Sequence, residues 1–149
     1  MKKYKIAVAV IMLAVVIAVA ASLTACRTEE YVVENHDWQF KFAQSSETGE
    51  VIFCSEEFAE GFPDAKIMEM TAKAENGKLI ATDGENEMVF TYAVEKAVPG
   101  ESTIYDIADE NGIKGNASVG KTTYADGSAE YTLIISFEGR AFYFKAPVE

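Results

Sequence analysis

Histidine and cysteine, which often act as a base, a nucleophile or a zinc ligand, are few in this chain of 149 residues: it has one histidine and two cysteines. The one histidine, His36, lies beside Asp37, and no serine occupies a Gly-x-Ser-x-Gly turn, so a serine hydrolase lacks its parts. No His/Cys cluster has zinc spacing. We therefore predict no catalytic residue, no metal and no cofactor, and expect a protein that is not an enzyme. A catalytic carboxylate pair among the 24 acidic residues is the open alternative.

The segment from Gly115 to Thr122 matches the letters of a phosphate-binding loop. Such a loop needs a strand before it and a helix after it, because the helix N-terminus must face the phosphates. Here Thr123 and Tyr124 favour a strand, and Asp126-Gly127 then turns the chain. We expect a glycine-broken strand and no nucleotide binding.

Cys26 ends a pattern at the N-terminus. Three lysines (Lys2, Lys3 and Lys5) precede an uncharged apolar run over residues 6–21, and Leu23, Thr24, Ala25 and Cys26 follow. This arrangement resembles the lipobox of bacterial lipoprotein signal peptides. The resemblance implies a helical signal peptide over residues 1–25, cleavage before Cys26, and a lipid anchor on its thiol at the extracytoplasmic face of the cell membrane. The alternative is a plain signal anchor, because the apolar run is nearly long enough to span a bilayer.

Removal of the signal peptide leaves 10 basic and 24 acidic residues, a net charge of −14. This charge opposes nucleic-acid binding, which depends on cations that neutralise phosphates. Residues 26–35 then comprise the lipidated cysteine and an acidic tether, and residues 36–147 form one domain. Cys54 has no intrachain partner and lies in an apolar run, so we expect a buried, inert thiol.

Alternation of apolar and polar residues runs through the domain and predicts strands with one buried face. Trp38, Phe40 and Phe42 share one face of the first predicted strand, and Asn76-Gly77 is one of several tight-turn signals. We predict an all-β, antiparallel up-and-down barrel of eight or nine strands, with a β-sandwich as the alternative. One short helix is expected over residues 56–60, with Ser55 as its N-cap.

The barrel is similar at fold level to the lipocalin-like, or calycin, proteins. That resemblance implies that Trp38 on the first strand contacts Arg140 or Lys145 from the last strand, as a cation–π contact that closes the barrel. His36 stands where lipocalins carry glycine. Residues 122–128 and 132–136 are also similar to small lipoproteins of Gram-positive anaerobes, a likeness that implies no particular activity.

Aromatic side chains are the remaining candidates for a binding site. A ligand cavity inside the barrel could be lined by five of them: Phe40, Phe90, Tyr92, Tyr131 and Phe142. We expect a membrane-anchored, non-enzymatic binding module for a small, partly apolar ligand. The alternative is a cell-surface interaction or scaffold protein with a filled core and an acidic exterior. An interior void of about 300 Å³ or more would favour the first.

Overall fold

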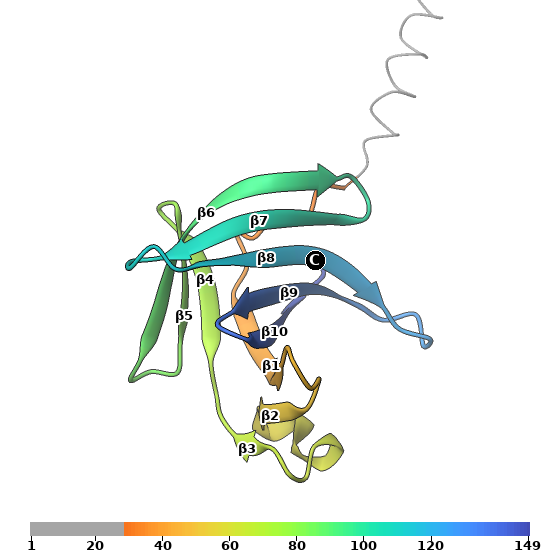
Figure 1. Cartoon of the computed structure of the whole chain (residues 1–149). Coiled ribbons are helices and arrows are strands. Elements are labelled where there is room, and N and C mark those ends of the chain that lie inside the picture. Colours follow the sequence, from red (N-terminus) through yellow and green to blue (C-terminus); the bar gives the residue numbers. More distant parts are fainter. Residues whose placement is uncertain (1–28) are drawn as a thin grey trace, which may run out of the picture.

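The computed structural model describes residues 29–149, which form an all-β barrel with one 3-10 helix. Eight antiparallel strands close the barrel, because β1 pairs with β4 on one side and with β10 on the other (Figure 1). Around the barrel they are β1 (Trp38–Ser45), β4 (Thr71–Glu75), β5 (Lys78–Thr82), β6 (Glu87–Val98), β7 (Ser102–Asp109), β8 (Lys114–Thr123), β9 (Ala129–Phe137) and β10 (Arg140–Pro147). The barrel prediction is confirmed.

The remaining elements form an insertion outside the barrel, between β1 and β4. They are β2 (Val51–Cys54), η1 (Glu56–Gly61) and β3 (Lys66–Ile67), and they lie below the barrel in Figure 1. The first residues of β1, Trp38 and Gln39, pair with β4, whereas Phe42 to Gln44 pair with β2. β1 therefore pairs with strands of both the barrel and the insertion. The insertion interrupts the up-and-down order of the barrel strands once.

β1 also contains a β-bulge in its pairing with β10. Phe40 pairs with Phe144 and Phe42 pairs with Tyr143, so Lys41 and Phe42 together oppose one residue of β10. An extra residue shifts the alternation of faces, because side chains otherwise change sides at every residue. Phe42 therefore lies outside the barrel, where its ring stacks on that of Tyr143 at 4.5 Å between centroids. The ring of Phe62 is tilted against it at 5.3 Å. The prediction that Phe42 shares a face with Trp38 and Phe40 is wrong.

The short helix is confirmed, but its cap differs from the prediction. Ser55 has an extended backbone, yet its hydroxyl makes no capping hydrogen bond and is buried without a partner. The backbone amide of Glu56 instead donates to the Glu69 carboxylate at 2.8 Å. An acidic side chain from a neighbouring segment thus binds the first free amide of the helix, whereas a serine cap would have accepted from the second or third.

The segment that matches a phosphate-binding loop is a strand, as predicted. Gly115 to Thr122 lie within β8, which pairs with β7 and β9 along its length. A side chain on Gly115 would collide with the backbone oxygen of Ser136. This glycine is required by close packing of strands rather than by a ligand.

The interior of the barrel is packed with apolar side chains. Trp38, Phe90 and Phe144 are fully buried, together with Leu133 and Ile135. Burial of a large apolar side chain contributes about 1.5–3 kcal/mol, so this cluster is a main source of stability. Cys54 is a buried free thiol, as expected. Among the helices within residues 29–149, none has the length and apolar character needed to cross a membrane.

Candidate functional site

The N-terminal strap, residues 29–36, lies against one end of the barrel. Tyr31 and Val33 belong to the hydrophobic core. The backbone amide of Val33 donates to the Tyr105 hydroxyl at 3.1 Å, and the Trp38 indole donates to the Val33 carbonyl at 2.9 Å. The expected acidic tether is therefore, from Glu29 onward, part of the folded domain. The three consecutive apolar residues Tyr31, Val32 and Val33, within an otherwise acidic segment, are the sequence signal that could have indicated this packing.

Two of the predicted ligand-lining residues bind this strap. The Tyr92 hydroxyl donates to the Glu34 carboxylate at 2.7 Å, and the Tyr131 hydroxyl donates to the Glu29 carboxylate. Burial and the bond to Glu34 raise the pKa of Tyr92 to about 12. The bond to Glu29, with burial, raises the pKa of Tyr131 to about 12. Both phenols therefore hold their protons at neutral pH and donate to the strap.

The other three predicted lining residues lie in the packed core. Phe40 packs against Phe144 at 5.6 Å, and Phe90 packs against Phe137 at 4.9 Å, both near edge-to-face. Phe142 is also buried in the same cluster. Such aromatic contacts fill space and add about 0.5–1.5 kcal/mol each beyond area burial. The interior aromatic side chains thus contact one another.

The predicted closing contact of Trp38 takes another form. Arg140 lies over Phe53 at 5.9 Å and Lys145 over Phe58 at 5.4 Å, whereas the ring next to Trp38 is that of His36, at 5.0 Å. Lys145 pairs with Gln39, so its side chain leaves the opposite face of the sheet from Trp38. Arg140 pairs with Ser45, at the far end of β1. The cation–π expectation is replaced by an aromatic contact, and His36 is half-buried.

A polar group on the outer face, which we call the lysine cluster, comprises Lys41, Lys145, Glu57, Glu130 and Tyr124. The Lys41 ammonium lies 2.5 Å from the Glu130 carboxylate and donates to the Tyr124 hydroxyl at 3.2 Å. Tyr124 in turn donates to Glu130 at 2.6 Å. Lys41 follows the inward-facing Phe40 on β1 and points outward by alternation, and β9 supplies Glu130. These three side chains form a closed triangle of hydrogen bonds.

Both charged members of this triangle are largely buried, with side chains 13% and 17% exposed. Burial lowers the pKa of Lys41, but the bonds to Glu130 and Tyr124 outweigh it, so the pKa is raised above its usual value. Burial raises the pKa of Glu130, but the bonds from Lys41 and Tyr124 outweigh it, so the pKa is lowered. The pair is therefore fully ionised at neutral pH.

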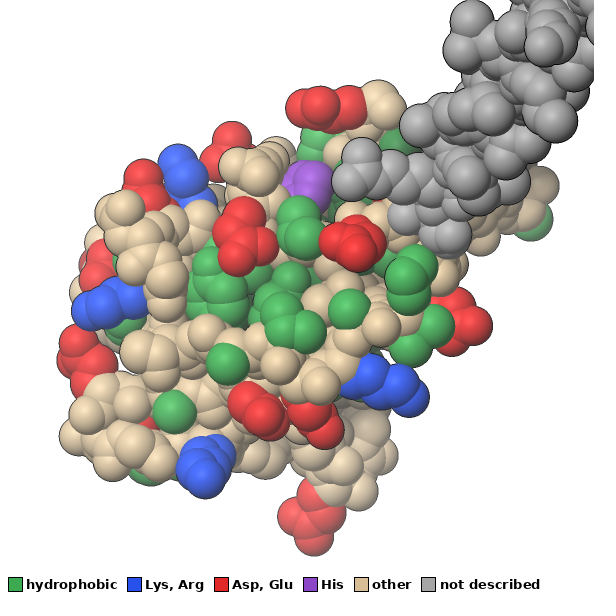
Figure 2. Space-filling view, turned by 90° about the horizontal axis from the view of Figure 1, so that it is seen from above, with side chains coloured by type: hydrophobic (Ala, Val, Ile, Leu, Met, Phe, Trp, Pro, Cys, Tyr) green, Lys and Arg blue, Asp and Glu red, His purple; other side chains and the backbone are tan. Residues whose placement is uncertain are grey.

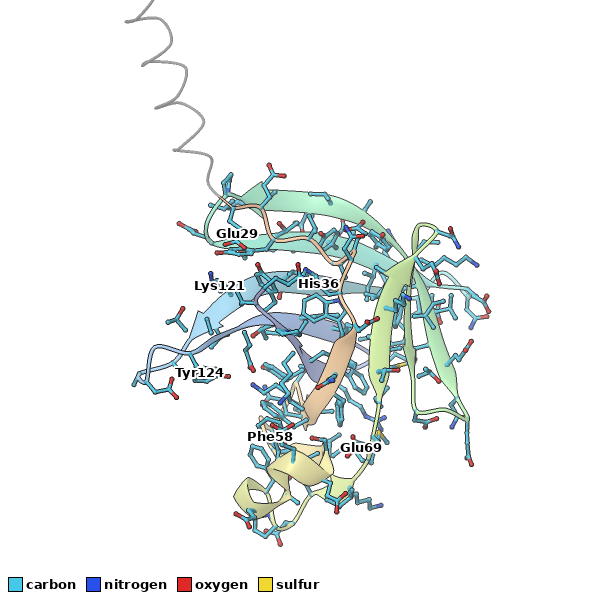
Figure 3. The ribbon with its side chains drawn as sticks, turned by 180° about the vertical axis from the view of Figure 1, so that it is seen from behind. Glu29, His36, Phe58, Glu69, Lys121 and Tyr124 are labelled. Carbon is cyan, nitrogen blue, oxygen red and sulfur yellow. The ribbon has the colours of Figure 1, made fainter. Side chains whose placement is uncertain are left out.

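Phe58 of η1 joins this triangle to a second ion pair. Its ring lies 5.2 Å from the Lys41 ammonium and 5.4 Å from that of Lys145. Lys145 also binds the Glu57 carboxylate at 2.6 and 2.7 Å. Figure 3 shows Phe58 on the insertion and Tyr124 on the barrel, so the cluster joins the two parts of the fold.

An open cavity of about 400 Å³ borders this cluster. Apolar groups and the charges of Glu130 and Lys145 share its wall, which consists of Gln39, Ala129, Glu130, Lys145, Ala146 and Pro147. A second open cavity of about 450 Å³ lies over β6, β7 and β8, with Asp106 and Lys114 in its wall. Figure 2 views the barrel from above, and there acidic side chains surround a central group of hydrophobic ones.

The remaining predicted residues, Leu23, Thr24, Ala25 and Cys26, lie outside the described part of the chain. Within residues 29–149, no group of three or more His, Cys, Asp or Glu side chains could hold a metal ion. The sequence does not identify Lys41, Glu130 and Tyr124 as members of one cluster. Lys41 and Glu130 are 89 residues apart, and no local pattern relates them.

Residues 29–149 form a closed, eight-stranded antiparallel β-barrel with a small outer insertion. No protein-family model matches the chain, and searches of curated proteins and of solved structures gave no match.

Proposed function

We propose that this protein is a membrane-anchored extracytoplasmic lipoprotein and a non-enzymatic binding module. Its ligand is a small, partly apolar molecule with an anionic group, which binds on the outer face of the barrel beside the lysine cluster. One observation carries the proposal: the cavity of about 400 Å³ combines apolar walls with the ammonium of Lys145. A lipocalin-like relationship belongs to the same proposal and is supported by Trp38 on the first strand of a closed barrel.

The arrangement of the core favours an outer site over an inner one. The interior aromatic residues contact one another, and the strap covers one end of the barrel through Tyr31 and Val33. A ligand inside would have to displace side chains whose burial stabilises the fold. The outer cavity needs no such rearrangement.

Electrostatics favour binding of an anion at this place. The mature chain carries a net charge of −14, so an anionic ligand is repelled by most of its surface. In the lysine cluster beside the cavity, the charges of Lys41 and Lys145 offset those of Glu57 and Glu130, and Lys145 and Glu130 also line the cavity. Glu57 is 61% exposed, so a ligand carboxylate or sulfonate can take its place on Lys145 at little cost in desolvation.

The ionisation of the cluster supports binding rather than catalysis. A nucleophilic lysine requires a lowered pKa, and a general base works best with a pKa near neutrality. The pKa of Lys41 is raised and that of Glu130 is lowered, so both move away from those values. The groups hold charge in place and do not exchange protons near pH 7.

The test is a titration of the soluble form that begins at Arg27, which keeps every described residue, with the anionic probe 8-anilinonaphthalene-1-sulfonate. We expect Lys145→Gln to weaken binding at least about fivefold, which corresponds to roughly 1 kcal/mol. Lys73→Gln on β4 makes the same charge change on another strand and is the matched control. Equal affinity of both variants would contradict the outer site.

Native mass spectrometry of the same soluble form, before and after denaturation, tests for a ligand acquired from the host. A mass that falls on denaturation would reveal its class. The anchor is tested separately: Cys26→Ala should leave unprocessed precursor and remove lipid labelling, and normal processing would refute the lipoprotein assignment. If no small molecule binds, the alternative is an interaction protein that acts through its acidic exterior (Figure 2).

A further inference from the structure

We infer that the barrel is held in one orientation on the membrane, with the β6–β7 turn next to the bilayer and the β7–β8 turn pointing away. This inference rests on the proposed lipid anchor at Cys26 and extends it, because it names the face of the domain that meets the lipid surface.

Glu29 is fixed to the barrel by three separate contacts. Its backbone carbonyl accepts a hydrogen bond from the amide of Gly100, in the β6–β7 turn, at 2.9 Å. Its carboxylate accepts a hydrogen bond from Tyr131 and lies 3.6 Å from the Lys121 ammonium. Figure 3 shows Glu29 and Lys121 at the same end of the barrel. Residue 29 therefore belongs to that end and does not move independently.

The rest of the strap is also bound to the barrel, so the strap cannot add length to the connection between the barrel and Cys26. Val33 is bound through both its amide and its carbonyl, and Glu34 accepts the hydrogen bond from Tyr92. To free the strap, the protein would have to expose Tyr31 and Val33, which are 8% and 0% exposed. Exposure of two such apolar side chains to water is unfavourable, so the strap stays in place.

The remaining connection to the anchor is short. Only Arg27 and Thr28 lie between Cys26 and Glu29, so the two Cα atoms are at most about 11 Å apart. A freely reorienting domain needs a tether comparable to its own dimensions. The β6–β7 turn, to which Glu29 is bound, must therefore stay close to the bilayer surface.

The antiparallel order of the strands then places the other turns. β7 runs from Ser102, beside the β6–β7 turn, to Asp109. Glu101 and Glu110 flank this strand and are separated by about 30 Å of extended chain. Residues 124–128, between β8 and β9, lie at the membrane end, whereas residues 83–86 and 138–139 lie at the far end with Glu110.

The experiment uses the full-length, lipidated protein reconstituted into phosphatidylcholine vesicles that contain a nitroxide-headgroup lipid. A fluorophore is attached at E101C or E110C, two exposed turn positions; Cys54 is buried and does not compete for the label. Because nitroxide quenching acts only at short range, we expect at least about threefold stronger quenching at position 101 than at position 110, given their separation of about 30 Å.

A matched control lengthens the connection without touching the barrel. Insertion of about 12 Gly and Ser residues between Thr28 and Glu29 adds roughly 20 Å of reach and should bring the quenching ratio close to one. Equal quenching at both positions in the uninserted, vesicle-bound protein would overturn the fixed orientation while leaving the anchor intact. Failure of the protein to sediment with vesicles would instead overturn the anchor, and this inference with it.

Discussion

The hydroxyl of Tyr105 accepts a hydrogen bond from the backbone amide of Val33 at 3.1 Å, across 72 residues of sequence. Val33 is fully buried, so this amide has no access to water. The contact joins the N-terminal strap to β7 and turns an acidic segment near the chain start into a part of the core. This contact and the lysine cluster should both contribute to the stability of the fold.

Replacement of Tyr105 by phenylalanine should lower the free energy of unfolding by about 1–3 kcal/mol, because the buried Val33 amide loses its partner. Tyr143→Phe is the control, since the Tyr143 hydroxyl accepts only from the half-buried Gln44 side chain and its loss should cost less than about 1 kcal/mol. Urea denaturation measures both. Hydrogen exchange at Val33 should also accelerate in Tyr105→Phe, and unchanged exchange would argue against the contact.

The strap should detach at high pH. The pKa of both Tyr92 and Tyr131 is raised to about 12, so the folded state holds their protons more tightly than the unfolded chain, whose tyrosines titrate near 10. The resulting stability is present below pH 10 and is lost as the pH rises towards 12. Burial also raises the pKa of Tyr105, so absorbance titration of the phenolates should show three late-ionising tyrosines, and two in Tyr92→Phe. Titration of all the tyrosines together near pH 10 would contradict this assignment.

The ion pair of Lys41 and Glu130 should show strong coupling in a double-mutant cycle with Lys41→Met and Glu130→Gln. Because both side chains are less than one-fifth exposed, we expect a coupling energy of about 1–3 kcal/mol at pH 7. The lowered pKa of Glu130 makes this stability present above its usual pKa of 4.5, and it is lost as the pH falls through the lowered value. The raised pKa of Lys41 makes the stability of the pair present below the usual lysine pKa of 10.5. This stability is lost as the pH rises through the raised value. A coupling that persists at pH 2 would count against the pair.

The start of η1 offers a test in which a substitution at the N-cap position should be harmless. Ser55→Ala removes a buried hydroxyl that has no partner, so stability should stay the same or rise by up to about 1 kcal/mol. Glu69→Ala removes the acceptor of the Glu56 amide and should cost about 0.5–1 kcal/mol. Thermal unfolding of the two variants compares them directly. The reverse order would show that Ser55 is the true cap.

Two glycines of β8 should respond differently to the same substitution. Gly115→Ala brings a methyl group into the backbone oxygen of Ser136, so the strands must separate and stability should fall by about 2 kcal/mol or more. Gly120→Ala meets the Glu101 backbone oxygen at 3.3 Å, a contact that a small shift relieves, and should cost about 1 kcal/mol or less. Equal losses in chemical denaturation would mean that close packing does not explain Gly115.

The strands, most turns and the all-β class could be predicted from the sequence, with a closed barrel as one of two expected arrangements. Period-two alternation in β6 and β9 marks a buried face, and Asn76-Gly77 forms the β4–β5 turn with positive φ at both residues. These signals are local, since backbone preferences and face alternation act within a few residues. The same local reading located η1 and the buried Cys54.

The contacts between side chains that are distant in the sequence could not be predicted from it. A single bulge at Lys41 sent Phe42 outward, Glu69 bound the first amide of η1 where a Ser55 cap was expected, and the strap packed against one end of the barrel. Lys41 and Glu130 came together across 89 residues. Such contacts arise from sheet closure and register, which depend on the free energy of the whole fold and leave no local pattern.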